Sequence, residues 1–142
     1  MHRTVERMLR TNVERPMAAP DALASCIQAC LACAQACTAC ADACIAERAP
    51  AELEHCIRIS LDCADLCSTT ARVLTRQLKP DLGLVTALLE LCALACESCA
   101  IECDRHASTF LVTHVCAAIC HETCDECRRL VPLTADAARA HH

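Results

Sequence analysis

The chain has 142 residues, a formal net charge of −5 and 17 cysteines, with Phe110 as its only aromatic residue among Phe, Tyr and Trp and Gly83 as its only glycine. This length suffices for one domain with a hydrophobic core, and the negative charge leaves no basic face for nucleic acid. The scarcity of glycine and aromatic residues, beside abundant alanine and leucine, favours an all-helical fold.

The first predicted element is a short amphipathic helix over residues 4–14, where apolar side chains recur at helical spacing. Pro16 and Pro20 end this helix and form a linker to the rest of the chain. Residues 1–20 are therefore predicted to be an N-terminal helix and linker that precede the main domain.

Four longer helices follow the linker. They are predicted at residues 21–47, 51–78, 81–106 and 109–130. Asp21 is the expected N-cap of the first helix, and Ser108 or Thr109 that of the last. Short loops make consecutive helices antiparallel, which predicts an all-α, antiparallel up-down-up-down four-helix bundle with a short N-terminal amphipathic helix. The bundle is expected over residues 21–131, and residues 132–142 are expected to be a flexible tail because Pro132 ends the last helix.

The first long helix contains the segment CIQACLACAQACTACADAC at residues 26–44, where six cysteines follow steps of 4, 3, 4, 3 and 4 residues. This spacing is typical of a helix that buries one seam. All six thiols therefore share one stripe about 27 Å long. Cysteine can serve as a small hydrophobic residue, but that role explains one or two positions better than six in register.

The same stripe recurs on the other three helices, where Ser60, Thr70 and His106 occupy further positions in register. We therefore expect all the thiols to face the bundle axis and to act as metal ligands. In chain order they are Cys26, Cys30, Cys33, Cys37, Cys40, Cys44, Cys56, Cys63, Cys67, Cys92, Cys96, Cys99, Cys103, Cys116, Cys120, Cys124 and Cys127.

A disulfide-stabilised secreted fold is not expected. The cysteine count is odd, and helical neighbours hold their Cβ atoms about 5–6 Å apart, whereas a disulfide needs about 3.5–4.5 Å. The charged N-terminus MHRTVERMLR lacks the apolar region of a signal peptide. Gln28, Gln35 and Asp42 interrupt the longest apolar stretch, so we expect no membrane span. The prediction is a reduced, cytoplasmic protein.

Soft thiolates select Cu(I), zinc or iron–sulfur clusters. Structural zinc sites close with four ligands and usually take Cys-x-x-Cys from a turn, whereas these cysteines lie inside helices. The Cys-x2-Cys-x2-Cys-x3-Cys-Pro pattern that binds iron–sulfur clusters in ferredoxins does not occur in the sequence. Cu(I) accepts two or three thiolates, and its single charge offsets buried thiolates nearly one for one, which predicts many Cu(I) ions per chain, on the order of one per thiol. A zinc or cadmium buffer and an iron–sulfur protein are the alternatives.

The chain resembles the bacterial cytosolic copper storage proteins, four-helix bundles with cysteine-filled cores that load many Cu(I) ions. The resemblance covers residues 21–130 and rests on the segment at 26–44, on CALACESCAIEC in the third long helix and on CAAICHETCDEC in the fourth. It implies high-capacity Cu(I) storage and detoxification, a homotetramer and no enzymatic activity, with a copper chaperone as a candidate donor. No nucleophile–base pair stands out to suggest catalysis.

Three histidines are candidate ligands besides the thiols. His106 continues the stripe of its helix, His55 precedes Cys56, and His114 lies one turn into the last helix. His121, His2, His141 and His142 are expected to be solvated.

The antiparallel topology places the three candidate histidines at one end of the bundle, where we expect copper to enter. Apolar side chains are expected to close the other end: Leu74, Leu78, Val85, Leu89 and Leu130. We expect the metal-free protein to be folded, with further apolar contacts from Leu61, Leu88, Leu91 and Ile119.

Overall fold

The computed structural model describes residues 2–48 and 50–140 of the chain. These residues form five α-helices and a short 3-10 helix, and no strand occurs among them. The elements are α1 (His2–Thr11), α2 (Pro20–Ile45), η1 (Pro50–Leu53), α3 (Glu54–Thr75), α4 (Leu82–His106) and α5 (Leu111–Ala140).

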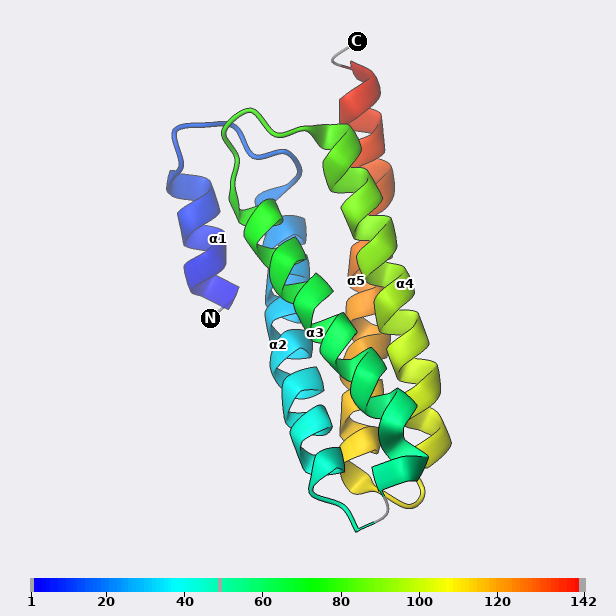
Figure 1. The fold of residues 1–142 in the computed structure, drawn as a ribbon. Coiled ribbons are helices and arrows are strands. Elements are labelled where there is room, and N and C mark those ends of the chain that lie inside the picture. The colour runs from blue at the N-terminus through cyan, green and yellow to red at the C-terminus, as the bar shows by residue number, and fades with distance from the viewer. Residues whose placement is uncertain (1, 49, 141–142) are drawn as a thin grey trace.

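Helices α2 to α5 form the predicted up-down-up-down bundle (Figure 1). Each helix packs on its predecessor, and α5 also packs on α2, which closes the ring around one core. The turns between α2 and α3 and between α4 and α5 lie at the same end of the bundle (Figure 1). The short helix α1 lies beside α2 and buries Leu9 against it.

The helix boundaries follow local chemistry and correct several expectations. Helix α2 begins at Pro20, which occupies the first turn where a missing N–H costs nothing, so Asp21 is not its N-cap. Asp81 caps α4 and accepts a hydrogen bond of 3.0 Å from the backbone N–H of Leu84. Ser108 and Thr109 do not cap α5. Instead, the backbone N–H of Thr109 donates to the carbonyl of His106 in the turn that follows α4.

Helix α3 ends at Thr75 rather than at the predicted residue 78. The chain beyond it is fixed by Gln77, which is buried and bonds to two backbone groups. Its amide nitrogen donates to the carbonyl of Leu74, and its oxygen accepts from the N–H of Met17 in the N-terminal linker. Leu78 is consequently exposed, and the expectation that it belongs to the apolar end of the bundle is wrong.

The last helix continues through Pro132 to Ala140, so the prediction that α5 stops before this proline is wrong. Residues 132–140 are helical rather than a tail outside the bundle. Tertiary contacts explain the difference, because Thr134 is fully buried and its hydroxyl lies 2.8 Å from that of Thr86 on α4. His141 and His142 lie outside the described residues.

The core consists mainly of cysteine and alanine along the bundle axis, with several leucines at one end and Leu53 of η1 buried at the other. Leu61 and Leu91, which we expected to supply core contacts, are instead 43% and 47% exposed. Helices α2 and α4 are long and apolar enough to cross a membrane by length and composition alone, although polar residues in α2 led us to expect otherwise. Their most regular apolar feature is the buried cysteine stripe.

Candidate metal centre

All 17 cysteines are buried, and all are free thiols. This agrees with the prediction that the sequence does not encode a disulfide scaffold. The side chains come from all four bundle helices, because each helix turns its stripe toward the common axis.

The middle of the bundle shows the arrangement most clearly. The Cys33 sulfur lies 3.8 Å from that of Cys37 on the same helix, 3.9 Å from that of Cys63 on α3 and 3.8 Å from that of Cys120 on α5. Cys96 on α4 completes the ring, with its sulfur 3.8 Å from that of Cys63. Sulfurs from all four helices therefore meet at nearly one level.

These contacts continue along the bundle as overlapping groups of thiols. Within each group the sulfurs lie within 4.8 Å of one another, and the three groups of four share members. Sulfur contacts of 3.8 Å between Cys56 and Cys103 and 3.9 Å between Cys103 and Cys99 connect one group of three to a group of four. The groups include Cys33, Cys63, Cys67 and Cys96; Cys33, Cys37, Cys63 and Cys120; Cys37, Cys99, Cys116 and Cys120; Cys26, Cys30 and Cys127; and Cys40, Cys44 and Cys56. The result is a column of thiols, which we call the thiol column.

Cysteines four residues apart on one helix approach one another as the spacing predicts. The sulfurs of Cys63 and Cys67 lie 3.9 Å apart, as do those of Cys99 and Cys103. This separation is much longer than a disulfide bond of about 2.05 Å, yet short enough for both sulfurs to bind one soft metal ion between them. One helix can therefore supply two ligands to the same ion without bending.

Hydrogen bonds between thiols divide the cysteines into easily and poorly ionised groups. A hydrogen bond with Cys120 lowers the pKa of Cys63 to about 6, and one with Cys127 lowers the pKa of Cys26 to about 5. Burial raises the pKa of Cys44 to about 11. A few thiolates stabilised by neutral neighbours are suitable first ligands for a cation, because the thiolate is the form that binds metal.

Cys124 differs from the other cysteines. Burial is the main cause of its raised pKa, and the positive charge of Arg128 acts against it by favouring the thiolate. Arg128 forms a 2.7 Å ion pair with Glu97 across α4 and α5. Among the described residues, Cys124 makes none of the thiol–thiol hydrogen bonds. Thr123 is fully buried beside it and donates a 3.1 Å hydrogen bond to the carbonyl of Ala29 on α2.

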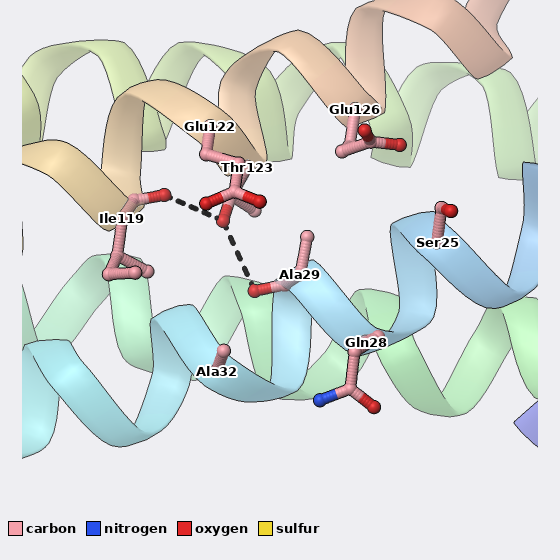
Figure 2. Close-up of a pocket in the computed structure, with 8 residues that line it drawn as sticks. All are labelled: Ser25, Gln28, Ala29, Ala32, Ile119, Glu122, Thr123 and Glu126. Atoms are coloured by element: carbon pink, nitrogen blue, oxygen red, sulfur yellow. Dashed lines mark hydrogen bonds between the residues drawn. The ribbon is translucent and has the colours of Figure 1, made fainter. Parts of the chain in front are cut away.

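Figure 2 shows this Thr123 contact in a surface pocket of about 200 Å³ between α2 and α5. The pocket is lined by small and polar side chains and by Ile119, and no cysteine is among them. It lies on the outside of the bundle, so it is separate from the thiol column.

The three candidate histidines differ in their surroundings. His106 is half-buried, and its Nε2 lies 3.2 Å from Oε1 of Glu102, while its ring contacts Phe110 at a centroid distance of 6.4 Å. His55 and His114 are exposed. His121 lies on the outer surface, with Nε2 2.9 Å from Asp104, as expected for a solvated residue. The ligand roles of His55, His106 and His114 stay predictions.

Glu102 was not predicted as part of this region. It is only 6% exposed and contacts both His106 and Arg105. Its spacing of four residues from His106 was the available signal, since residues four apart share a helix face. A carboxylate that hydrogen-bonds a metal-binding histidine is a common way of orienting the ring.

The opposite end of the bundle is closed by apolar side chains. Leu74, Leu89 and Leu130 are buried there as predicted, and Leu23 from α2 joins them. The thiol column therefore has a leucine end and a histidine end. The histidine end is defined by His55, His106 and His114.

Comparison with known proteins decides the family. The model of the copper storage protein family matches residues 19–132, which is most of the chain and includes every cysteine. The chain belongs to the copper storage protein family. A comparison with curated protein sequences finds no significant match.

Solved structures of copper storage proteins are similar to the whole bundle. The structure of Ccsp from Streptomyces lividans loaded with 10 copper equivalents is 43% identical, with a TM-score of 0.87 over 90% of this chain and 98% of that one. A five-copper form of the cytosolic copper storage protein from S. lividans is 46% identical, with a TM-score of 0.78 over 79% of this chain and 93% of that one.

A variant of the same S. lividans protein, with two histidines replaced by alanine, is also similar to this copper storage protein. It is 44% identical, with a TM-score of 0.80 over 82% of this chain and 98% of that one. These matches agree with the predicted family and confirm the bundle fold.

Proposed function

We propose that this protein stores Cu(I) as cargo in the thiol column. The observation that carries the proposal is the continuity of the column, in which overlapping groups of four sulfurs lie within 4.8 Å of one another and further contacts of 3.8 and 3.9 Å extend them toward the α2–α3 turn. Soft thiolates favour Cu(I), and shared sulfurs can bridge neighbouring ions. The S. lividans relative loaded with 10 copper equivalents supports a capacity of many ions per chain.

Charge balance favours Cu(I) over divalent metals. Buried thiolates without counter-charges are strongly unfavourable, and 17 cysteines could carry up to that number of negative charges. Monovalent ions that bridge thiolates offset these charges nearly one for one. A tetrahedral zinc site, in contrast, uses four ligands that it does not share, and the overlap of the groups leaves few independent sets of four.

The role is storage and detoxification in the cytosol, without enzymatic activity. The cytosolic location follows from the relative, a cytosolic copper storage protein from S. lividans. We also propose that the protein assembles as a homotetramer and that a copper chaperone is a candidate donor. Both proposals rest on the family resemblance.

A competition experiment tests the choice of metal. The reduced protein is incubated anaerobically with equal excesses of Cu(I), Zn(II) and Cd(II), desalted and analysed for bound elements. Copper should dominate the bound metal, and a Cys63→Ala/Cys67→Ala variant should bind fewer ions because two overlapping groups each lose ligands. Bound zinc or cadmium in excess of copper would assign the column to a divalent-metal buffer, and a coloured protein containing iron and inorganic sulfide would assign it to an iron–sulfur cluster.

We further propose that copper enters at the histidine end. His106 is the only one of the three histidines held by a buried carboxylate, Glu102, and the leucine end presents apolar side chains that bind cations poorly. A His106→Ala variant should load Cu(I) more slowly by about tenfold, with nearly unchanged final capacity, as the loss of one hydrogen-bonded ligand predicts.

His121→Ala is the matched control for this variant, because His121 also contacts an acidic side chain but lies on the outer surface. Loading rates are measured by stopped-flow transfer from a coloured Cu(I) chelator complex. Equal loading rates for the wild type and the His106→Ala variant would contradict copper entry at the histidine end.

A further inference from the structure

The cysteines nearest the histidine end are closed off from solvent. Cys40, Cys44 and Cys56 form a group of thiols there, and each side chain is fully buried. Cys103 of α4, whose sulfur lies 3.8 Å from that of Cys56, is fully buried too. A Cu(I) ion outside the bundle therefore cannot contact any of these four sulfurs until a covering side chain moves.

Leu53 is the covering side chain on the α2–α3 side. It is the last residue of η1, lies three residues before Cys56 and is fully buried in the same core cluster as the thiols. Residues three apart share a helix face, and α3 begins at the histidine end (Figure 1), so Leu53 lies beyond Cys56 toward this end. The short helix η1 also contacts α2, the helix that carries Cys44.

No other buried side chain accompanies Leu53 on its turn. Of the residues between Cys44 and Cys56 whose burial the structure describes (45–48 and 51–55), only Leu53 is buried. Its neighbours Glu52 and Glu54 are exposed. A single apolar side chain therefore fills this position from the α2–α3 turn.

The leucine end of the bundle is closed in a different way. Leu23, Leu74, Leu89 and Leu130 are buried there, and they come from the four bundle helices α2 to α5. An ion could pass this layer only if whole helices moved apart. Leu53 instead belongs to a 3-10 helix of four residues, whose hydrogen-bond geometry is poorer than that of an α-helix. Of the two closures, the one at the histidine end is therefore easier to open.

A leucine at this position impedes the ion without binding it. Cu(I) prefers soft thiolate ligands, and a charge in apolar surroundings without ligands is strongly unfavourable. On the α4–α5 side, the partly buried ring of Phe110 contacts that of His106 and adds a second apolar side chain. An ion that passes Leu53 in either direction must wait until the leucine swings aside. Such a barrier slows entry and exit alike and leaves the capacity unchanged.

We propose that the Leu53 side chain closes the thiol column at the histidine end and sets the rate at which Cu(I) enters and leaves. The inference rests on the proposed function, because it takes Cu(I) as the cargo and the histidine end as the entrance. It gives Leu53 a role in retention, in which stored ions stay in the column while the leucine is in place.

Copper exchange tests the control of the rate. Loading from a coloured Cu(I) chelator complex and removal by an excess of a stronger chelator are followed by stopped-flow absorbance. In a Leu53→Ala variant both rates should rise by about tenfold, because the truncated side chain leaves space for the ion. The final capacity should equal that of the wild type. This pattern differs from that of His106→Ala, which should slow loading.

Leu23→Ala is the matched control, because Leu23 is an equally buried leucine at the opposite end of the bundle. It loses the same atoms from the core, so its rates report any general loosening of the bundle. Both of its exchange rates should match those of the wild type. Equal acceleration in the two variants would overturn the proposal.

Thiol labelling of the metal-free protein tests the closure without copper. The reduced chain is treated with N-ethylmaleimide, and the labelled peptides are quantified by mass spectrometry. The ratio of variant to wild-type rate for one thiol cancels the intrinsic reactivity of that thiol. For Leu53→Ala this ratio should rise at Cys44 and Cys56 and stay near one at Cys26 and Cys127, which lie toward the leucine end.

Each measurement has an outcome that contradicts the proposal. Unchanged Cu(I) exchange rates in Leu53→Ala would overturn the control of the rate, and unchanged labelling of Cys44 and Cys56 would overturn the closure. If circular dichroism shows that Leu53→Ala does not fold, the milder Leu53→Val variant decides by the same criteria. A wild type that binds no Cu(I) would contradict the storage function, whereas the labelling would still report on the closure, so the two failures are distinguishable.

Discussion

At the scale of single residues, Ser60 marks a position in the cysteine stripe of α3 where a further thiol ligand would fit. It is fully buried in register with the cysteines of α3, and its hydroxyl oxygen lies 3.7 Å from the Cys99 sulfur. A Ser60→Cys variant should therefore bind about one more Cu(I) per chain, because a further soft ligand joins the column.

Ser108→Cys is the control for this variant, since residue 108 is exposed in the turn after α4. A single exposed thiol should not retain Cu(I) against a competing chelator. Capacity is measured by anaerobic titration of the three proteins. If both substitutions raise the Cu(I) capacity equally, any added thiol binds an ion and a position in the thiol column is not required.

The ionisation of the Cys44 thiol predicts that the stability of the metal-free protein depends on pH. Burial raises the pKa of this thiol to about 11, above the 9.0 of a free cysteine. Between pH 9 and 11 the Cys44 thiol is ionised in the unfolded chain but still protonated in the native chain. The free energy of unfolding therefore does not depend on Cys44 below pH 9 and falls as the pH rises from 9 to 11.

The difference in Tm between the metal-free wild type and a Cys44→Ala variant should therefore narrow over this range. Thermal unfolding followed by circular dichroism under reducing conditions measures it. A difference that stays constant from pH 7 to 11 would mean that Cys44 ionises equally in both states.

Gln77 connects the end of α3 to the N-terminal linker and explains how the N-terminal segment is attached to the bundle. Its side chain joins the end of α3 to the linker between α1 and α2, through hydrogen bonds of 2.6 Å to the Leu74 carbonyl and 2.9 Å from the Met17 N–H. A Gln77→Ala variant leaves both backbone groups without these partners and should lose about 1–3 kcal/mol of stability.

The linker in this variant should also be cleaved faster by a protease, since its anchor is removed. Arg76→Ala is the control, because Arg76 is an exposed neighbour. Chemical denaturation and limited proteolysis measure both effects. Equal stability and cleavage of the two variants would show that Gln77 does not hold the linker.

Among the helices, the sequence predicts those boundaries that depend on local interactions. Asp81 caps α4 as expected because its side chain acts locally on the N–H of Leu84. Pro132 misled the prediction because its effect is also local, whereas the burial of Thr134 and its contact with Thr86 are tertiary. Packing across the bundle outweighs the cost of one proline inside the helix.

For the whole molecule, the cysteine spacing was sufficient to predict the bundle and its thiol-lined axis. The regular steps of three and four residues specify one face of each helix, and short loops specify the antiparallel order. The spacing could not predict that Leu91 lies outside, because α4 has two apolar stripes and periodicity does not say which one is the core. The spacing also did not predict that Thr123, next to Cys124, is fully buried and bonds to α2.

The most direct test of the central claim is the number of Cu(I) ions that one chain binds. The reduced protein is titrated anaerobically with Cu(I) in the presence of a chromophoric chelator, and a thiol assay in denaturant first establishes that all 17 cysteines are free. A column of shared thiolates predicts saturation on the order of one ion per thiol. Saturation at about one ion per four thiols would mean separate four-ligand sites, and would contradict copper storage in a continuous column.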